Sequence, residues 1–315
     1  MEGVAQIEDV EIEKIIVPTI SVFAPLLEAK RKEIESVPKR TFQYGDTERH
    51  KLDIYYPTTT TKTTTKTPIV FFVYGGGFVT GARTLPPPAD IAYANVLTWF
   101  SARGFVAVVP DYRLVPHVQF PGPAQDVADA VRWVVEHPQD ASGPNALDLD
   151  LDSIFLIGQS AGAAHVATSL LYPNLIAPSV RPRIRGAVLI AGAYHLHPAG
   201  TTTGFEELVN MYWASEAEAR ATVPLALLNG LAAEDVKALP PLLLVEGERE
   251  PQWVKVVGKD FYEALKGRVG EDEGRVRKIW GKAHNHLSIT WCLGTGEGEE
   301  WAEEAVEWMK AAVKG

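Results

Sequence analysis

The residues from 151 to 165 constrain the fold of this chain more than any other stretch. The β-branched and aromatic run Asp152–Ile157 is typical of a buried strand, and the alanine-rich run that continues to Leu171 favours a helix. Between them lies Gly158-Gln159-Ser160-Ala161-Gly162. A tight strand-to-helix turn needs small neighbours, and it lifts a central serine on a strained backbone clear of the sheet. We therefore predict that Ser160 is a nucleophile.

The same turn places the N–H group of Ala161 at the start of a helix, where the helix dipole favours negative charge. We expect this group to donate to an oxyanion. The alternative is a glycine-rich turn with an incidental serine, because G-x-S-x-G is short and recurs by chance. The strand before it and the helix after it favour the catalytic interpretation.

A second glycine-rich segment follows a second buried strand. Ile69–Val73 is a continuous apolar run, as expected of a central parallel strand, and it ends in Tyr74-Gly75-Gly76-Gly77-Phe78. Glycines let backbone N–H groups approach a ligand without interference from a Cβ atom. A flexible turn would have the same composition, but acyl transfer at Ser160 needs a second set of oxyanion donors.

The rest of the chain alternates strand and helix patterns, beginning with two segments that alternate like exposed edge strands, Thr41–Tyr44 and Leu52–Tyr56. Buried strands are expected at Phe105–Val109, Gly186–Ile190, Pro241–Val245 and Arg275–Trp280, with helices at Ala89–Ala102, Gln125–Glu136 and Val254–Leu265 and a closing amphipathic helix carrying Trp301, Ala305, Trp308 and Ala312. This alternation predicts an α/β fold: a doubly wound, mostly parallel, eight-stranded sheet in a single domain over residues 1–315.

Two segments stand apart from this alternation. Residues 1–36 are expected to form a helical N-terminal arm, with Ile12, Ile15, Ile16 and Ile20 on one face and with Pro18 and Pro25 breaking the pattern. Residues 195–239 are irregular and helical and fall between strands on the side where loops carry chemistry, so they are a candidate lid. The Thr/Lys-rich stretch 58–67 is expected to be a solvated loop.

Composition narrows the classes of function. The 315-residue chain has a net charge of −10, which argues against nucleic acid or an anionic membrane surface as a partner. Its one cysteine, Cys292, allows no intramolecular disulfide. No apolar run is long enough to span a bilayer, and no signal peptide is visible at the acidic start, so we expect a cytoplasmic protein. No metal cluster or phosphate loop is present, so neither metal nor cofactor is expected.

A nucleophilic serine needs a base, and the base needs an orienting acid. In a fold of this kind they follow the serine in the order acid, histidine. Three carboxylates, those of Glu246, Glu248 and Glu250, compete for the acid role after the strand that ends at Val245. His284 and His286 compete for the base after the last strand, and spacing on a loop does not separate them.

Three motifs together resemble the α/β-hydrolase superfamily: Tyr74–Phe78, Asp111-Tyr112-Arg113-Leu114 and Gly158–Gly162. The resemblance covers roughly residues 40 to 313 and is strongest to the esterase/lipase branch that includes hormone-sensitive-lipase-like esterases and kynurenine formamidases. It implies a Ser160 nucleophile, an acid after the seventh strand and a histidine after the eighth. The oxyanion donors that it implies are the N–H groups of Gly76, Gly77 and Ala161.

The chain departs from that family at three positions. Tyr74 stands where the family has histidine, His117 stands where an acidic residue is usual, and the position of the family's aspartate is Glu250. Glutamate can still fix the histidine tautomer, although its extra methylene changes its reach. Glu246 and Glu248 are then expected to be solvated loop residues or strand-end charges.

The resemblance of Asn285-His286-Leu287-Ser288 to the family's histidine segment favours His286 as the base. His284, which fits an alternative Gly-x-x-His spacing, is then expected to support the cleft. His165, on the helix after Ser160, is expected to be a packed core histidine. No partner motif accompanies the remaining histidines, which are His50, His117, His137, His195 and His197.

The expected activity is hydrolysis of a carboxylic ester, or of a lactone, thioester or aryl formamide, by a serine hydrolase with a Ser160–Glu250–His286 triad. Several aromatic residues lie in segments that border the site in this family, and they favour a bulky apolar or aromatic small-molecule substrate; they are Phe78, Tyr194, Tyr212, Trp213 and Trp253. Each could instead be core. The alternatives are an acyltransferase or cyclase that uses the same site, and a non-catalytic receptor like the plant gibberellin receptors. Those receptors lack the catalytic histidine.

Overall fold

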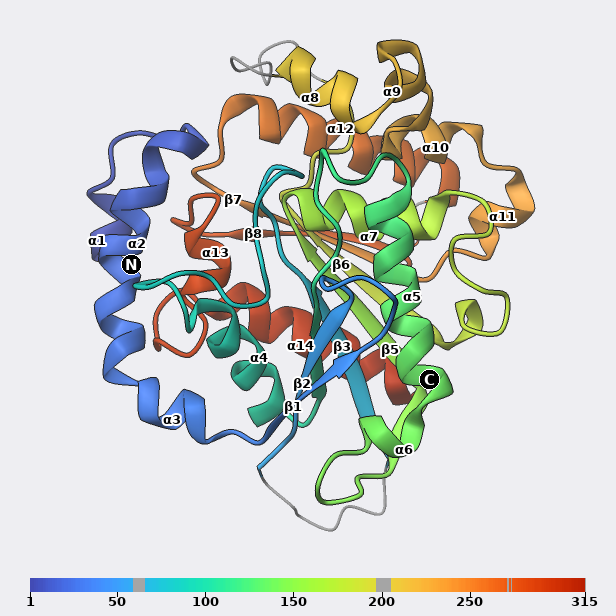
Figure 1. Ribbon diagram of the computed structural model, residues 1–315. Coiled ribbons are helices and arrows are strands. Elements are labelled where there is room, and N and C mark those ends of the chain that lie inside the picture. The colour runs from blue at the N-terminus through green and yellow to red at the C-terminus, as the bar shows by residue number, and fades with distance from the viewer. Residues whose placement is uncertain (59–65, 197–204, 271, 273, 315) are drawn as a thin grey trace.

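The computed structural model describes residues 1–58, 66–196, 205–270, 272 and 274–314. Its centre is an eight-stranded sheet in the order β1-β2-β4-β3-β5-β6-β7-β8 (Figure 1). The strands are β1 (Lys39–Gln43), β2 (Lys51–Tyr55), β3 (Thr67–Val73), β4 (Val106–Pro110), β5 (Leu149–Gln159), β6 (Ile184–Ile190), β7 (Leu242–Gly247) and β8 (Val276–Gly281). β2 runs antiparallel to both of its neighbours, and all other pairs are parallel. The predicted mostly parallel, eight-stranded sheet is confirmed.

Helices cover both faces of this sheet (Figure 1). α4 (Ala92–Ala102) and α14 (Glu300–Lys314) pack on one face, and α5 (Gly122–Glu136), α7 (Ala161–Leu171) and α12 (Gln252–Val269) lie on the other. The shorter helices here are α6 (Pro138–Ala141), α13 (Ser288–Trp291) and a 3₁₀ turn at Arg181–Arg183. In the described part of the chain, no helix is long and apolar enough to cross a membrane.

The expectation that residues 52–56 form an exposed edge strand is wrong. β2 lies between β1 and β4, and its Leu52 and Ile54 side chains are fully buried. Asp53, the polar residue of the alternation, is buried as well, because the guanidinium of Arg83 lies 3.1 Å from its carboxylate. A buried ion pair therefore produces the same sequence pattern as a solvated strand face.

The N-terminal arm contains α1 (Glu2–Ala5), α2 (Ile12–Ala29) and α3 (Arg31–Ser36). The expectation that Pro18 and Pro25 break the helical pattern is wrong, because α2 runs through both. Each proline removes one backbone donor, and both lie on the exposed side of α2, where water can hydrate the carbonyl groups that lose a partner. The opposite side of α2 is buried through Ile15, Thr19, Phe23 and Leu27.

Between β6 and β7 the chain forms α8 (Phe205–Tyr212), α9 (Glu216–Thr222), α10 (Pro224–Gly230) and α11 (Ala233–Lys237). Residues of α8, of α9 and of the turns beside them form, with Val115, an apolar cluster that is separate from the main core, which we call the lid cluster; its buried members are Val115, Val209, Tyr212, Trp213, Ala219 and Val223. Residues 197–204, with His197, and residues 59–65 of the Thr/Lys-rich stretch lie outside the described residues.

Candidate active site

The turn at Ser160 joins the end of β5 to the start of α7. Ser160 has φ 54° and ψ −123°, a strained conformation for a residue with a side chain. A Cβ atom on Gly158 would lie 2.5 Å from the carbonyl oxygen of Gly162, and one on Gly162 would lie 2.1 Å from that of Val73. Glycine is therefore required on both sides of the serine. The Ser160 N–H donates to the Ile190 carbonyl of β6 at 2.9 Å and fixes the turn against the sheet.

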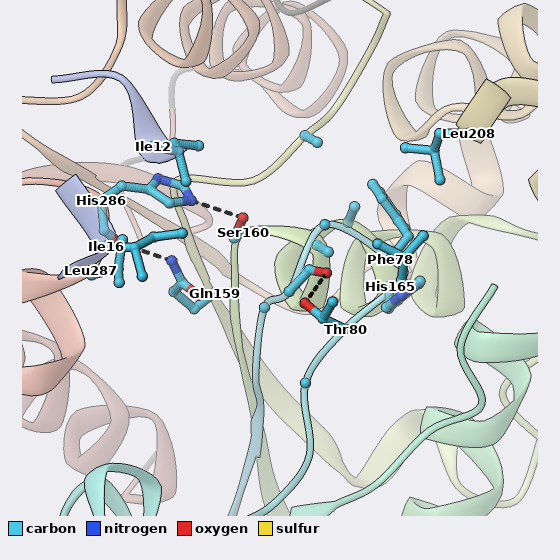
Figure 2. A pocket seen from close by; sticks show the side chains of 18 of the residues that line it. Ile12, Ile16, Phe78, Thr80, Gln159, Ser160, His165, Leu208, His286 and Leu287 are labelled. Atoms are coloured by element: carbon cyan, nitrogen blue, oxygen red, sulfur yellow. Dashed lines mark hydrogen bonds between the residues drawn. The ribbon is translucent and has the colours of Figure 1, made fainter. Parts of the chain in front are cut away.

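Ser160, His286 and Glu250 lie in one chain of hydrogen bonds. Nε2 of His286 is 2.8 Å from the Ser160 Oγ (Figure 2). Its Nδ1 is 2.7 Å from Oε2 of Glu250. His286 follows β8 and Glu250 follows β7, so both side chains reach the serine from loops at the carboxyl end of the parallel strands. With the proton on Nδ1 donated to the carboxylate, Nε2 is free to accept the serine proton.

The other two candidate acids lie elsewhere. Glu246 is buried at the end of β7 as an ion-pair partner of Lys278, so it is a strand-end charge and not a solvated loop residue. Burial raises the pKa of its carboxyl group. Glu248 accepts from the N–H of Ala283 at 2.9 Å.

His284 is buried and makes its hydrogen bonds away from Ser160. Its Nε2 lies 2.7 Å from the Gly298 carbonyl oxygen, and its Nδ1 lies 3.1 Å from Oγ of Ser288. Burial lowers the pKa of this imidazole. His284 therefore holds the segment that carries His286, while the two histidine rings have different surroundings.

His165 is buried on α7, with its ring centre 4.8 Å from that of Tyr112 and 5.2 Å from that of Phe78. Burial lowers the pKa of His165 to about 3, so the imidazole is neutral near pH 7. Other histidines have partners that the sequence analysis did not assign. His50 lies 3.2 Å from Asp126, His195 lies 3.0 Å from Asp260, and the His137 ring stacks on Trp133 at 4.7 Å.

Two side chains that sequence reasoning did not single out hold the His286 loop. Gln159 Nε2 donates to the His286 carbonyl oxygen at 2.9 Å. Oδ1 of Asn285 accepts from the N–H groups of Leu287 and Ser288, at 3.1 Å and 2.9 Å. Both lie inside motifs quoted from the sequence, in which Gln159 occupied a variable position. The Gln159 bond joins residues 127 positions apart and is visible only in the folded chain, whereas the Asn285 bonds are local and are of the kind that asparagine commonly makes in turns.

The N-terminal arm is hydrogen-bonded to the two loops that carry Glu250 and His286. Asn285 Nδ2 donates to the Thr19 Oγ1 of α2 at 2.9 Å, next to His286. The guanidinium of Arg249, the residue before Glu250, donates to the carbonyl oxygens of Val4 and Ile7. The arm is therefore part of the framework of the site.

The glycine loop after β3 lies against the serine. A Cβ atom on Gly75 would lie 2.8 Å from the Ser160 Cβ. Gly76 and Gly77 have φ values of 138° and 59°, which favour glycine. The Gly76 carbonyl oxygen accepts from both N and Oγ1 of Thr80, at 2.9 Å each. Because a peptide unit is planar and trans, the N–H of Gly77 then points away from Thr80.

Asp111 joins the two ends of this loop. Tyr74, at its start, donates its hydroxyl to Oδ1 of Asp111 at 2.7 Å. Arg83, at its end, donates its backbone N–H to the same oxygen at 2.6 Å and pairs its guanidinium with Oδ2. Tyr112 donates its hydroxyl to the Tyr74 carbonyl oxygen at 2.8 Å, and the two rings stack at 4.8 Å. Tyr74 thus fixes the loop through its hydroxyl.

Ser160 and His286 open into a cavity of about 870 Å³. Phe78, Tyr212, Trp213 and Trp253 line it, as do Gly76, Gly77 and Ala161. Tyr194 does not line it: its side chain is buried and its ring stacks on Phe261 of α12 at 4.3 Å, so its expected place at the substrate is wrong. No lysine or arginine appears among the described lining residues.

In the described ranges no group of three or more His, Cys, Asp or Glu side chains could hold a metal ion. The arrangement places a serine hydroxyl, an imidazole and a carboxylate in one hydrogen-bond chain beside a largely apolar cavity. These are the groups that acyl transfer through a covalent intermediate requires.

Three comparisons relate the chain to known proteins. The family model described as BD-FAE matches residues 52–174. A protein of Arabidopsis thaliana named as a probable isoprenylcysteine alpha-carbonyl methylesterase is 26% identical over 267 residues, 80% of this chain and 52% of its own length. The kynurenine formamidase of Salmo salar is 26% identical over 227 residues, 72% of this chain and 68% of its own.

The chain therefore spans between about half and two thirds of the length of these two relatives. Among solved structures, one from a study of two fungal esterases of Rhizomucor miehei superposes with a TM-score of 0.66 at 21% identity. The superposition covers 99% of this chain and 96% of the other. The similarity in structure concerns the fold.

Proposed function

Because the chain belongs to the α/β-hydrolase superfamily and lies in its esterase/lipase branch, we propose that it is a serine hydrolase that cleaves a carboxylic ester through an acyl-enzyme on Ser160. The observation that carries this proposal is the hydrogen-bond chain from Ser160 through His286 to Glu250, built on the strained turn before α7. The names of the two relatives, a methylesterase and a formamidase, support cleavage at an acyl carbon.

In the first half of the reaction, Nε2 of His286 takes the Ser160 proton while Oγ attacks the carbonyl carbon of the ester. The carbonyl oxygen becomes an oxyanion, which accepts hydrogen bonds from the N–H groups of Gly77 and Ala161, with Gly76 as a third donor. Glu250 stabilises the imidazolium. When the tetrahedral intermediate collapses, the C–O bond breaks and His286 gives its proton to the leaving oxygen.

In the second half, His286 takes a proton from water, which attacks the acyl carbon, and Ser160 leaves with that proton. Thioesters and aryl formamides pass through the same steps with sulfur or nitrogen as the leaving atom, and in a lactone the leaving oxygen stays attached to the acyl group. The apolar lining of the cavity supports a small-molecule substrate with bulky apolar groups. In this proposal the chain is a single domain, in which residues 195–239 act as a lid over the cavity and residues 1–36 are a helical arm beside it.

Hydrolysis of p-nitrophenyl esters of graded acyl length tests the proposal. Ser160→Ala and His286→Ala should each lower kcat by about 10³-fold or more, because the members of a triad act as a unit. His284→Ala is the matched control and should keep measurable turnover per folded molecule, with folding checked by circular dichroism. Turnover of Ser160→Ala within about tenfold of the wild type would exclude the acyl-enzyme. The reverse order of losses at the two histidines would exclude His286 as the base.

A further inference from the structure

The cavity extends to both sides of Ser160 (Figure 2). On one side, His286 and Leu287 lie beside Ile12 and Ile16 of α2; with Ile20 of the same helix these make what we call the α2 end. On the other side lie Phe78, His165 and Leu208, which with Tyr212 and Trp213 make the lid end. The Phe78 ring contacts those of Tyr212 and Trp213, with centroids 5.2 Å and 6.3 Å apart.

The position of the base distinguishes the two ends chemically. His286 must give its proton to the leaving oxygen, so that oxygen has to come within hydrogen-bonding distance of Nε2. The leaving alcohol then extends from the His286 side of the serine, and the acyl chain extends toward the opposite side. The α2 end therefore receives the alcohol and the lid end receives the acyl group.

We propose that the stripe Ile12–Ile16–Ile20 of α2 is the leaving-group subsite and that it takes a bulky, uncharged, apolar alcohol. This inference rests on the proposed function and names its substrate class, an ester that is apolar on both sides of the carbonyl group. The three isoleucines are spaced by four residues, so they form one stripe on the helix. The ionisable lining residue that α2 contributes is Glu13, which disfavours an anionic leaving group.

The α2 end is held in place by polar bonds. Thr19 lies on the buried side of the same helix and accepts from Asn285, next to the base. α2 also packs against α13, whose Trp291 lines the cavity. The isoleucine stripe is thus fixed relative to His286 before any substrate arrives, as a specificity subsite requires.

A crossed series of esters tests this assignment. One arm keeps the butyryl group and varies the alcohol through methyl, butyl and octyl; the other keeps the methyl alcohol and varies the acyl chain from butyrate to octanoate. In the wild type kcat/KM should rise along both. Ile16→Ser should lower the octyl-to-methyl ratio among the butyrates by about fivefold and leave the acyl series unchanged. Leu208→Ser should instead lower the octanoate-to-butyrate ratio among the methyl esters and leave the alcohol series unchanged.

Val17→Ser is the matched control, because Val17 is the next residue of α2, is 69% exposed compared with 38% for Ile16, and does not line the cavity. It should change neither series. Equal effects of Val17→Ser and Ile16→Ser, or a wild-type kcat/KM that does not depend on the alcohol, would overturn the assignment. An exchange of the effects of Ile16→Ser and Leu208→Ser would place the alcohol at the lid end.

Acyl transfer gives a second, independent measurement. By microscopic reversibility, the site that releases an alcohol also admits one: the hydroxyl oxygen of 1-hexanol attacks the acyl carbon, His286 moves its proton to Ser160, and hexyl butyrate leaves. With methyl butyrate as donor, 1-hexanol should compete with water better than ethanol at equal concentration. Ile16→Ser should lower the ratio of hexyl butyrate to butyrate by about fivefold. An unchanged ratio contradicts the subsite, whereas a wild type that cleaves no ester contradicts the proposed function itself.

Discussion

The N-terminal arm and the lid helices both border the cavity, but they are held by different forces. The arm is joined to the loops of Glu250 and His286 by directional hydrogen bonds from Arg249 and Asn285. The helices α8 and α9 meet the body of the molecule mainly through the apolar lid cluster, with a backbone bond from Phe120 to Tyr212 at 2.8 Å. Hydrogen bonds fix distance and angle, whereas apolar side chains can repack at modest cost.

This difference predicts a division of roles. A change in the hydrogen bonds that join the arm to the Glu250 and His286 loops should alter the geometry at Ser160 and therefore the rate for every substrate alike, in contrast to a change in the isoleucine stripe of α2. A change in the lid cluster should alter the shape of one end of the cavity and therefore the order of preference among substrates. Four predictions, from the largest effect to the smallest, test this division.

The largest effect is expected on the acid loop that the arm holds. Glu250→Gln should lower kcat by about 10³-fold, because the neutral amide no longer stabilises the imidazolium and allows the wrong tautomer. Glu246→Gln, at the end of β7, and Glu248→Gln, on the loop that follows, are the controls and should cost far less, measured as kcat for one p-nitrophenyl ester. A larger loss at either control would show that the orienting carboxylate is not Glu250.

Thr19→Val should lower kcat/KM by about tenfold for all esters in the same proportion. It removes the acceptor of Asn285 Nδ2 and leaves a buried donor unsatisfied, at a cost of about 1–3 kcal/mol that loosens the His286 loop. Ser21→Ala on the same helix is the control, because the exposed Ser21 hydroxyl bonds only to Val17 of its own helix among the described residues. A changed ranking of esters at constant overall rate would contradict the division of roles.

The sequence was sufficient to identify residues whose function depends on a fixed local spacing. It was not sufficient to identify residues that are far apart in the chain and meet only in the folded protein. Ser160 and its glycines could be recognised because a strained turn needs small neighbours within two residues. The choice of Glu250 and His286 came from family resemblance, since spacing on a loop does not orient a side chain. Their roles stay predictions, although the geometry brings both residues to the serine.

Long-range polar contacts account for most of the features that the sequence analysis missed or predicted wrongly. Asn285 and Thr19 are 266 residues apart in the sequence, and Tyr74 and Asp111 are 37 residues apart, so no local sequence pattern predicts either contact. The polar alternation at Asp53 predicted an exposed strand because the Arg83 side chain that neutralises it comes from another segment. Pro18 looked like a helix break because solvation of the freed carbonyl depends on which side of α2 is exposed.

Trp213→Ala should change the ranking of acyl chains several-fold while lowering thermal stability less than a core truncation does. Trp213 belongs to the lid cluster and lines the cavity, so removing its ring enlarges the lid end, to which we assign the acyl chain. Trp301→Ala is the matched control: Trp301 is a buried tryptophan of the main core that does not line the cavity. It should lower the melting temperature and keep the ranking. If Trp213→Ala lost stability with an unchanged ranking, the lid cluster would be merely core.

The smallest effect concerns the pH dependence of stability beneath the lid end. Burial lowers the pKa of His165 to about 3, whereas an unfolded chain titrates this group near its usual value of 6.5. Between these two values the unfolded state binds a proton that the folded state does not, so stability is lost as pH falls through 6.5. From pH 7.5 to pH 5 this one group should cost about 2 kcal/mol of the free energy of unfolding. His284, whose pKa is also lowered, adds to the loss in the same direction.

His165→Gln should therefore show a shallower fall in urea-unfolding free energy over this range, by about the same 2 kcal/mol. Parallel curves for the variant and the wild type would mean that His165 becomes protonated in the folded protein, which requires the lid cluster to open at mildly acidic pH.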